Sequence, residues 1–197
     1  MKTLIHSQFT CIRNANRPVR ARGFTLIELM IVLAIVSILA GASIPSMQSL
    51  VRSIRLSSAT NDFIAALTIT RSEAVKRHGR VVMCKSPDGL ACAAAGGWEQ
   101  GWIVFHDLDD DGIRDRTEEV IFRAQALPRS IRVTGNQNIA RYISYVSGGT
   151  TKLTGGGFQA GTLTVCNQDA KGGAAREIIL SSSGRPRVQK TTVSACG

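Results

Sequence analysis

The feature that most constrains this chain is an uncharged run near its N-terminus. From Leu29 to Val51 the sequence has 23 positions without a charged residue. A helix needs about 20 predominantly apolar residues to span a membrane. Residues 1–23, which precede the run, carry five basic residues and no acidic one. Because basic flanks stay on the cytoplasmic side, the sequence predicts a single membrane span and an exported C-terminal part.

Glu28 stands directly before this run, within a stretch that is otherwise apolar. An isolated charge in hydrocarbon costs roughly 2.5 to 3.5 kcal/mol on insertion scales. Such a residue normally has a partner, because an unpaired buried charge is strongly penalised. The alternative is an ordinary signal anchor that tolerates one glutamate.

The segment RGFTLIELMIVLAIVSILAGASIP, residues 22–45, resembles the prepilin signature of type IV pilins and type II secretion pseudopilins. In that family a dedicated prepilin peptidase cuts after the glycine, here Gly23, and methylates the new N-terminal amine, here that of Phe24. The resemblance also implies that Glu28, the fifth residue of the mature chain, pairs with the N-terminal amine of a neighbouring subunit.

The same resemblance implies three parts of the chain. Residues 1–23 are the leader that the peptidase removes, and residues 24–51 are the transmembrane and assembly half of a long helix. Residues 52–197 are a globular pilin domain in the periplasm, anchored to the bacterial inner membrane until the protein is incorporated into a pilus. The expected partners are other pilins or pseudopilins.

The five cysteines fit an exported domain. Cleavage of the leader removes Cys11 and leaves an even number, and disulfides persist in oxidising compartments. Sequence proximity favours a bridge between Cys84 and Cys92, which leaves Cys166 with Cys196. Four cysteines allow three pairings. A zinc site is the less favoured alternative, because no histidine neighbours these cysteines.

The remaining sequence predicts an α+β fold. Residues 52–78 keep roughly helical spacing of apolar positions, and Gly79 is a helix stop. Short β-branched segments then alternate with turn residues, which predicts an antiparallel sheet or sandwich packed on the long N-terminal helix. The Gly-rich segment 148–157 is typical of a flexible connection. The expected strands lie within residues 80–85, 101–107, 118–125, 130–135, 140–148, 161–167 and 175–184.

Several segments of this domain resemble the GspH/FimT group of minor pilins and pseudopilins. They occur in the order seen in that group: ITRSEAVKRHGRVVMCKSPDG, WEQGWIVFHDLDDDG, GTLTVCN and LSSSGRPRV. The resemblance covers nearly the whole mature chain.

Charge is distributed unevenly along the domain. Residues 86–122 carry a net charge of −7, and residues 123–197 carry +8. A basic region of this kind indicates either an anionic partner or a solvated face.

The segment SSSGRPRVQK, residues 181–190, resembles the Gly-Arg-x-Arg motif of FimT-type pilins, which contributes to DNA binding. The matching positions are Gly184, Arg185 and Arg187, and Lys190 would extend the basic patch. Guanidinium groups suit bidentate phosphate contacts. The resemblance implies double-stranded DNA as the partner. No aromatic residue interleaves the arginines, so binding is expected through phosphates and without sequence preference. The alternative is a solvated hairpin with two exposed arginines.

Residues 107–118 match the calcium-loop pattern D-x-D-x-D-G-x5-E. The flanking segments are expected to be strands rather than the helices of an EF-hand, and Arg114 and Arg116 supply counter-charges within the loop. A polar hairpin rich in Asp and Gly is therefore the favoured explanation of the composition. We therefore expect no cofactor. The possible calcium ligands are Asp107, Asp109, Asp111 and Glu118.

Neither a catalytic triad nor a Gly-rich phosphate loop is evident, so we expect no enzyme. Trp98 and Trp102 are expected in the core.

Three functions remain possible for the protein. The first is a minor pilin that binds DNA for uptake in natural transformation. The others are a structural minor pilin that primes assembly and a type II secretion pseudopilin of the GspH type.

Overall fold

The computed structural model describes residues 23–168 and 173–196, apart from the side chains of residues 42–46. Apart from Gly23, the leader lies outside the described residues. The first element is helix α1, Leu26–Arg77. Thr25 stands just before it, and its hydroxyl accepts a hydrogen bond from the Glu28 N–H at 3.3 Å, which satisfies one of the free donors of the first turn.

The chain divides into two compact units, residues 1–44 and residues 45–197. In the first unit the described apolar side chains are exposed, from Phe24 to Leu39. An apolar surface of this extent is typical of a lipid or protein contact. Within the described part of the chain, no helix is long and apolar enough to cross a membrane. The membrane anchor at residues 24–51 stays a prediction.

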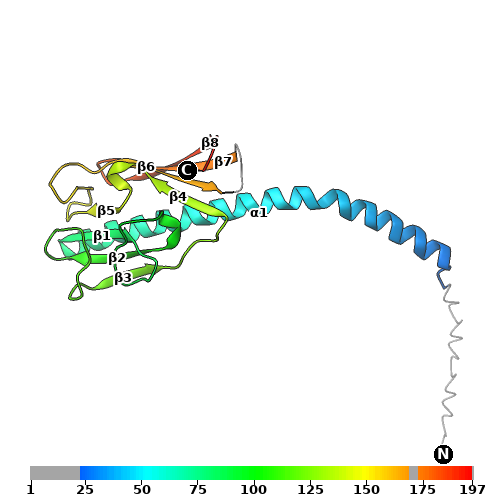
Figure 1. The fold of residues 1–197 in the computed structure, drawn as a ribbon, viewed down its shortest axis with the longest axis horizontal. Helices are drawn as coiled ribbons and strands as arrows, with labels where there is room; N and C mark the ends of the chain where they lie inside the picture. Colours follow the sequence, from blue (N-terminus) through cyan, green and yellow to red (C-terminus); the bar gives the residue numbers. More distant parts are fainter. Residues whose placement is uncertain (1–22, 169–172, 197) are drawn as a thin grey trace, which may run out of the picture. The chain divides into compact units, whose positions relative to one another are not determined.

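The second unit contains two four-stranded antiparallel sheets (Figure 1). The first sheet has the strand order β3-β2-β1-β5, and the second has the order β4-β6-β7-β8. The strands are β1 Arg80–Lys85, β2 Trp102–Asp107, β3 Val120–Ala124, β4 Ile131–Gly135, β5 Tyr142–Tyr145, β6 Gly161–Asn167, β7 Gly173–Leu180 and β8 Pro186–Val193. Two short 3-10 helices lie at Trp98–Gln100 and Gln137–Ile139.

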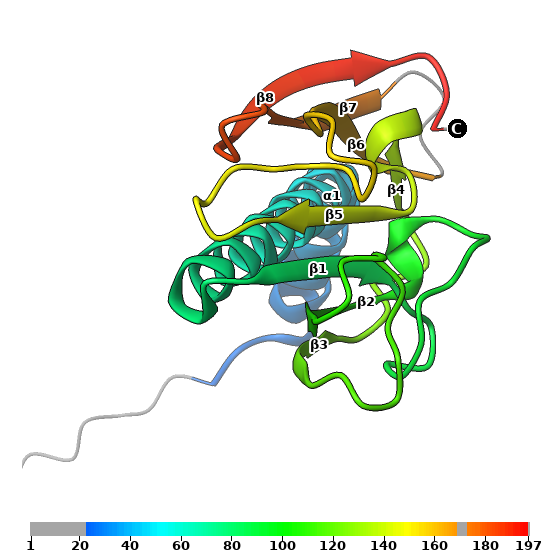
Figure 2. The same cartoon turned by 90° about the vertical axis from the view of Figure 1, so that its left-hand side faces the viewer.

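Both sheets pack their inner faces on the C-terminal part of α1, as Figure 2 shows. The buried helix positions begin at Leu56 and continue to Ala74. Phe63 is fully buried, and its ring lies 5.2 Å from that of Trp98 and 4.8 Å from that of Trp102. The expected core position of both tryptophans is confirmed. The α+β fold with its long N-terminal helix on antiparallel sheets is confirmed as well.

A smaller apolar cluster covers the outer face of the first sheet. Its buried members are Val82, Cys84, Ile103 and Phe105. Residues 86–101 connect β1 to β2, and residues 108–119 connect β2 to β3. The disulfide between Cys84 and Cys92 ties the first of these connections to β1.

The structure differs from the sequence expectation in two places. Strand β8 was not expected, because its sequence PRVQKTTV is mostly polar and all of its positions are exposed or half-buried. The flexible connection expected at 148–157 was wrong. Thr151 is fully buried there and forms an isolated bridge with Tyr145, and Lys152 bridges Phe158.

Candidate functional site

The Gly-Arg-x-Arg motif forms the tight turn that joins β7 to β8. The Gly184 N–H donates a hydrogen bond to the Ser181 carbonyl at 2.9 Å, which closes the turn. The Ser181 hydroxyl donates to the Arg185 carbonyl at 3.3 Å and shares a 2.8 Å hydrogen bond with the Ser183 hydroxyl. Strand β8 then begins at Pro186, directly between the two arginines.

Gly184 is the one position in this turn that requires glycine. Its φ is +75°, a conformation that side chains with a Cβ rarely adopt. A Cβ there would also clash with the Gly149 carbonyl oxygen and would stand 2.8 Å from the Tyr145 ring. The Tyr145 hydroxyl donates a 3.0 Å hydrogen bond to the Gly184 carbonyl. Burial raises the pKa of Tyr145, so the hydroxyl remains a donor at neutral pH.

Thr151 fixes the other side of the turn. Its N–H donates to the Ser182 carbonyl at 3.3 Å. Its hydroxyl donates to the Gln159 carbonyl at 2.6 Å and packs 3.2 Å from the Ser181 carbonyl. Thr151 lies in the Gly-rich segment that the sequence presented as flexible. The sequence alone therefore gives no sign that Thr151 and Tyr145 position the turn. Only their contacts, which join segments 30 or more residues apart, identify them.

The turn presents Arg185 and Arg187 as exposed side chains. Lys190 is also exposed, but it lies three positions after Arg187 in β8. Because side chains alternate along a strand, the two lie on opposite faces of the sheet. Lys190 pairs in register with Arg176, whose guanidinium bonds Ser57 of α1, so this is the helix-facing side. The register therefore does not support Lys190 as part of one patch with Arg187.

A further cation approaches the same turn from α1. The half-buried Arg71 lies against Gly149, with its Nε 3.1 Å from where a Cβ of that residue would stand. Gly149 in turn contacts Gly184. The helix thus contributes a basic residue beside the Gly-Arg-x-Arg turn, which the sequence alone did not indicate.

The acidic loop forms a separate site between β2 and β3. Its flanking elements are strands, as the sequence predicts. The Asp107 side chain is fully buried, and its Oδ2 accepts a 3.0 Å hydrogen bond from the Gly112 N–H. Burial raises the pKa of Asp107 to about 6, the Gly112 N–H opposes that rise, and the neighbouring Glu118 carboxylate adds to it. Glu118 is also buried.

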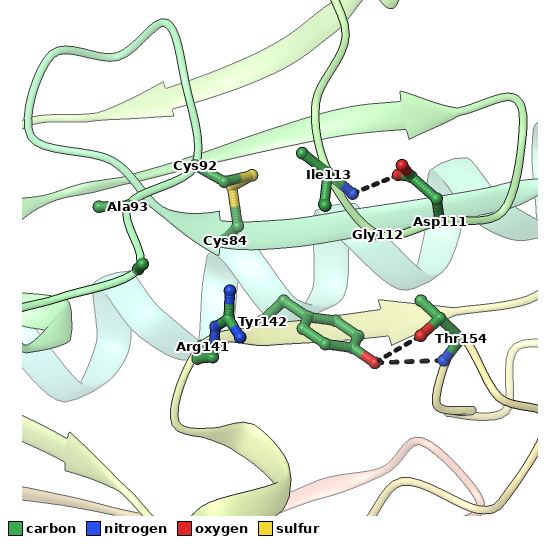
Figure 3. A pocket seen from close by; sticks show the side chains of 10 residues that line it. Cys84, Cys92, Ala93, Asp111, Gly112, Ile113, Arg141, Tyr142 and Thr154 are labelled. Carbon is green, nitrogen blue, oxygen red and sulfur yellow. Dashed lines mark hydrogen bonds between the residues drawn. A yellow bond between two sulfur atoms is a disulfide. The ribbon is translucent and has the colours of Figure 1, made fainter.

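A pocket of about 250 Å³ with a mixed polar and apolar lining lies beside this loop (Figure 3). The disulfide between Cys84 and Cys92 lines it together with Arg141 and Tyr142. The Tyr142 hydroxyl accepts a hydrogen bond from the Thr154 N–H at 3.1 Å, which holds the ring in place. The side chains that line this pocket offer no nucleophile paired with a base.

Both disulfides have the predicted pairing. The Cα atoms are 5.5 Å apart in the bridge between Cys84 and Cys92, and 5.8 Å apart in the bridge between Cys166 and Cys196. Cys196 follows β8, and Cys166 belongs to β6, so the second bridge fastens the end of the edge strand to the centre of its sheet.

The predicted processing and assembly residues lie at the start of α1. Gly23, Phe24 and Glu28 are all exposed in the single chain. This position leaves them accessible to a peptidase or to a neighbouring subunit, and their roles stay predictions.

Comparison with known proteins gives two family matches. Residues 59–184 match the family model described as type II transport protein GspH, and residues 19–44 match the prokaryotic N-terminal methylation motif. No curated protein matches the sequence.

Two solved structures are similar to this chain. A crystal structure of the type IV minor pilin FimU from Pseudomonas aeruginosa has 17% sequence identity and a TM-score of 0.54, and the match covers 72% of this chain and 95% of that one. The minor pseudopilin EpsH of the type 2 secretion system of Vibrio cholerae has 11% identity and a TM-score of 0.45, over 68% of this chain and 96% of that one. Because the GspH model alone matches more than half of the 197 residues, this chain belongs to the GspH family of type IV pilin-like proteins.

Proposed function

We propose that this chain is a minor pilin that binds double-stranded DNA without sequence preference through the turn of Gly184, Arg185 and Arg187, and that it serves DNA uptake. The observation that carries the proposal is the fixed turn that presents two exposed arginines. Hydrogen bonds from the Tyr145 hydroxyl and the Thr151 N–H hold its backbone, so little conformational freedom of the backbone is lost on binding.

The chemistry of this surface suits phosphate rather than bases. The two guanidinium groups can each form paired hydrogen bonds with phosphate oxygens. The turn and strand β8 contain no aromatic side chain on which a base could stack. With few contacts, binding is expected to be on the order of micromolar or weaker and strongly dependent on salt.

The N-terminal segment supports assembly into a filament. We propose that the prepilin peptidase releases Phe24 and that its amine pairs with Glu28 of a neighbouring subunit in the inner membrane or pilus. The exposed apolar side chains of the first unit would then be covered by lipid or by other pilins. We propose no catalytic role for the protein.

A structural minor pilin or a secretion pseudopilin is the second candidate function. The family match and the pilin fold favour this structural role as strongly as they favour DNA binding. Neither the match nor the fold depends on Arg185 and Arg187. The two candidates differ only in whether the Gly-Arg-x-Arg turn has a ligand.

The proposal is tested by DNA binding of the full chain in detergent at low salt. Replacing both Arg185 and Arg187 with glutamine should abolish measurable binding. The matched control replaces Arg129 and Arg141, which are also exposed, so that the net charge falls equally. If the parent does not bind DNA at low salt, the structural role becomes the better account.

A further inference from the structure

The acidic loop contains a buried carboxylate oxygen without a partner. Asp107 is only 2% exposed, and its Oδ1 has no hydrogen-bond partner among the described residues. A buried charged oxygen in this state is costly unless an ion or a hydrogen-bond donor compensates it. Its other oxygen, Oδ2, is already bonded to the Gly112 N–H.

Two further carboxylates converge on this residue. One oxygen each from Asp107, Asp109 and Glu118 lies within 4.8 Å of the others. Calcium binds oxygen ligands at about 2.3–2.6 Å, so two ligands on opposite sides of the ion stand roughly 5 Å apart. The three oxygens are therefore close enough to share one ion.

The backbone of the loop already has the shape that such a site needs. Gly112 occupies the glycine position of the D-x-D-x-D-G pattern and has a φ of +76°. It turns the chain back so that its N–H meets the first aspartate, Asp107. Glu118, at the last position of the pattern, accepts N–H donors from Leu108 at 2.7 Å and Asp115 at 2.9 Å. A carboxylate has about four lone-pair sites, so both hydrogen bonds leave room for a metal ion.

The local charges leave the cluster unbalanced. The Arg80 Nε lies 3.9 Å from Asp107 Oδ2 but bonds Asp110 at 2.8 Å, so its charge is shared. Among the residues that the structure describes, neither Asp109 nor Glu118 forms an ion pair. The Arg114 guanidinium also lies at this loop, but it bonds the backbone carbonyls of Leu90 and Glu118 at 3.0 Å rather than a carboxylate. Three carboxylates beside these two guanidinium groups retain a net negative charge, which suits a divalent cation.

We propose that Asp107, Asp109 and Glu118 bind one calcium ion that fastens the connection between β2 and β3. Backbone carbonyl groups and water would complete the coordination, as is usual for calcium. The proposal goes beyond the DNA-binding role and does not depend on it, because it uses none of the residues of the Gly-Arg-x-Arg turn.

The test is a calorimetric titration of the full chain in detergent with calcium chloride after treatment with EDTA. We expect one site with a dissociation constant on the order of 10⁻⁴ to 10⁻³ M, the range of exported calcium modules. Calcium should also raise the midpoint of thermal unfolding relative to EDTA. Magnesium at the same concentration should bind more weakly, because it dehydrates reluctantly and demands octahedral geometry.

Asp109→Ala is the diagnostic variant, because Asp109 is exposed and its removal leaves the core intact. It should weaken calcium binding at least about tenfold and remove the calcium-dependent thermal shift. Glu119→Ala is the matched control, since this exposed acid is adjacent to Glu118 but pairs with Arg77. The proposal is overturned if the parent shows neither heat nor a thermal shift at about 10 mM calcium. Equal binding of magnesium, parental affinity in Asp109→Ala, or equal weakening by Glu119→Ala would overturn it as well.

Discussion

The hydroxyl of Tyr145, in the first sheet, donates a hydrogen bond to the carbonyl of Gly184, in the turn of the second sheet, at 3.0 Å. The two residues are 39 positions apart in the sequence. This bond, with the contacts of Thr151, joins the basic turn to the other sheet, so the orientation of the turn depends on the packing between sheets.

Tyr145→Phe removes the hydroxyl and keeps the buried ring. The Gly184 carbonyl then loses its side-chain donor, so the free energy of unfolding should fall by about 1 kcal/mol, with an upper limit of about 3 kcal/mol for an unsatisfied buried group. DNA affinity should fall severalfold, because the turn is less well fixed. Urea denaturation and a binding titration measure the two effects. Tyr142→Phe, whose hydroxyl bonds Thr154 away from the turn, should leave DNA affinity unchanged.

Gly184→Ala places a Cβ against the Gly149 carbonyl at a residue with positive φ. The free energy of unfolding should fall by more than about 1 kcal/mol, because the strain and the steric clash add. Gly155→Ala is the control, since a Cβ at Gly155 meets nothing within 4 Å. Equal stability of the two variants in thermal denaturation would show that the turn does not require glycine.

Replacing Cys166 and Cys196 with serine opens the bridge that fastens the end of β8. Because the sequence separation of the two cysteines is 30, the free energy of unfolding should fall by about 3–4 kcal/mol in the chain-entropy treatment. The bridge between Cys84 and Cys92 closes a much shorter loop, with a sequence separation of 8, so replacing these two cysteines with serine should cost about 2–3 kcal/mol. Denaturation of the oxidised proteins checks this order. Peptide mapping without reductant checks the pairing, and any crossed bridge would contradict it.

Glu28→Ala should leave a cleaved protein that remains in the membrane but fails to enter pili. Without the carboxylate, the amine of a neighbouring subunit has no partner in a low-dielectric environment. Asp62→Ala, an exposed acid on the same helix, is the control. Immunoblots of sheared pili and of membranes measure incorporation and retention. Normal incorporation of Glu28→Ala would exclude the pairing.

The sequence was sufficient for the parts of the fold that local patterns control. Six of the strands fall within the expected segments and β7 overlaps the seventh, because β-branched runs between turn residues are local signals. Both cysteine pairs followed from proximity and count. Strand β8 could not be predicted in this way, because an exposed edge strand needs no alternation of apolar residues. Its register comes from hydrogen bonds to β7.

The sequence motifs of both sites could be predicted, but the residues that hold these motifs in place in the fold could not. Arg185, Arg187 and the acidic loop are evident in the sequence. The supporting roles of Tyr145 and Thr151 are not, because these residues contact the Gly-Arg-x-Arg turn from distant parts of the sequence. Composition even indicated the wrong property for the segment around Thr151, since its glycines suggested flexibility. The unpartnered oxygen of Asp107 likewise exists only in the folded loop.

The central claim, DNA binding through Arg185 and Arg187, is tested most directly by the salt dependence of DNA affinity. Each phosphate contact contributes about −0.9 to the slope of the logarithm of the binding constant against the logarithm of salt concentration. Single replacements of Arg185 or Arg187 with glutamine, measured at low salt on the full chain, should each reduce the slope by about 1, while Arg129→Gln leaves it unchanged. A slope that stays at the parental value in both arginine variants would contradict the account.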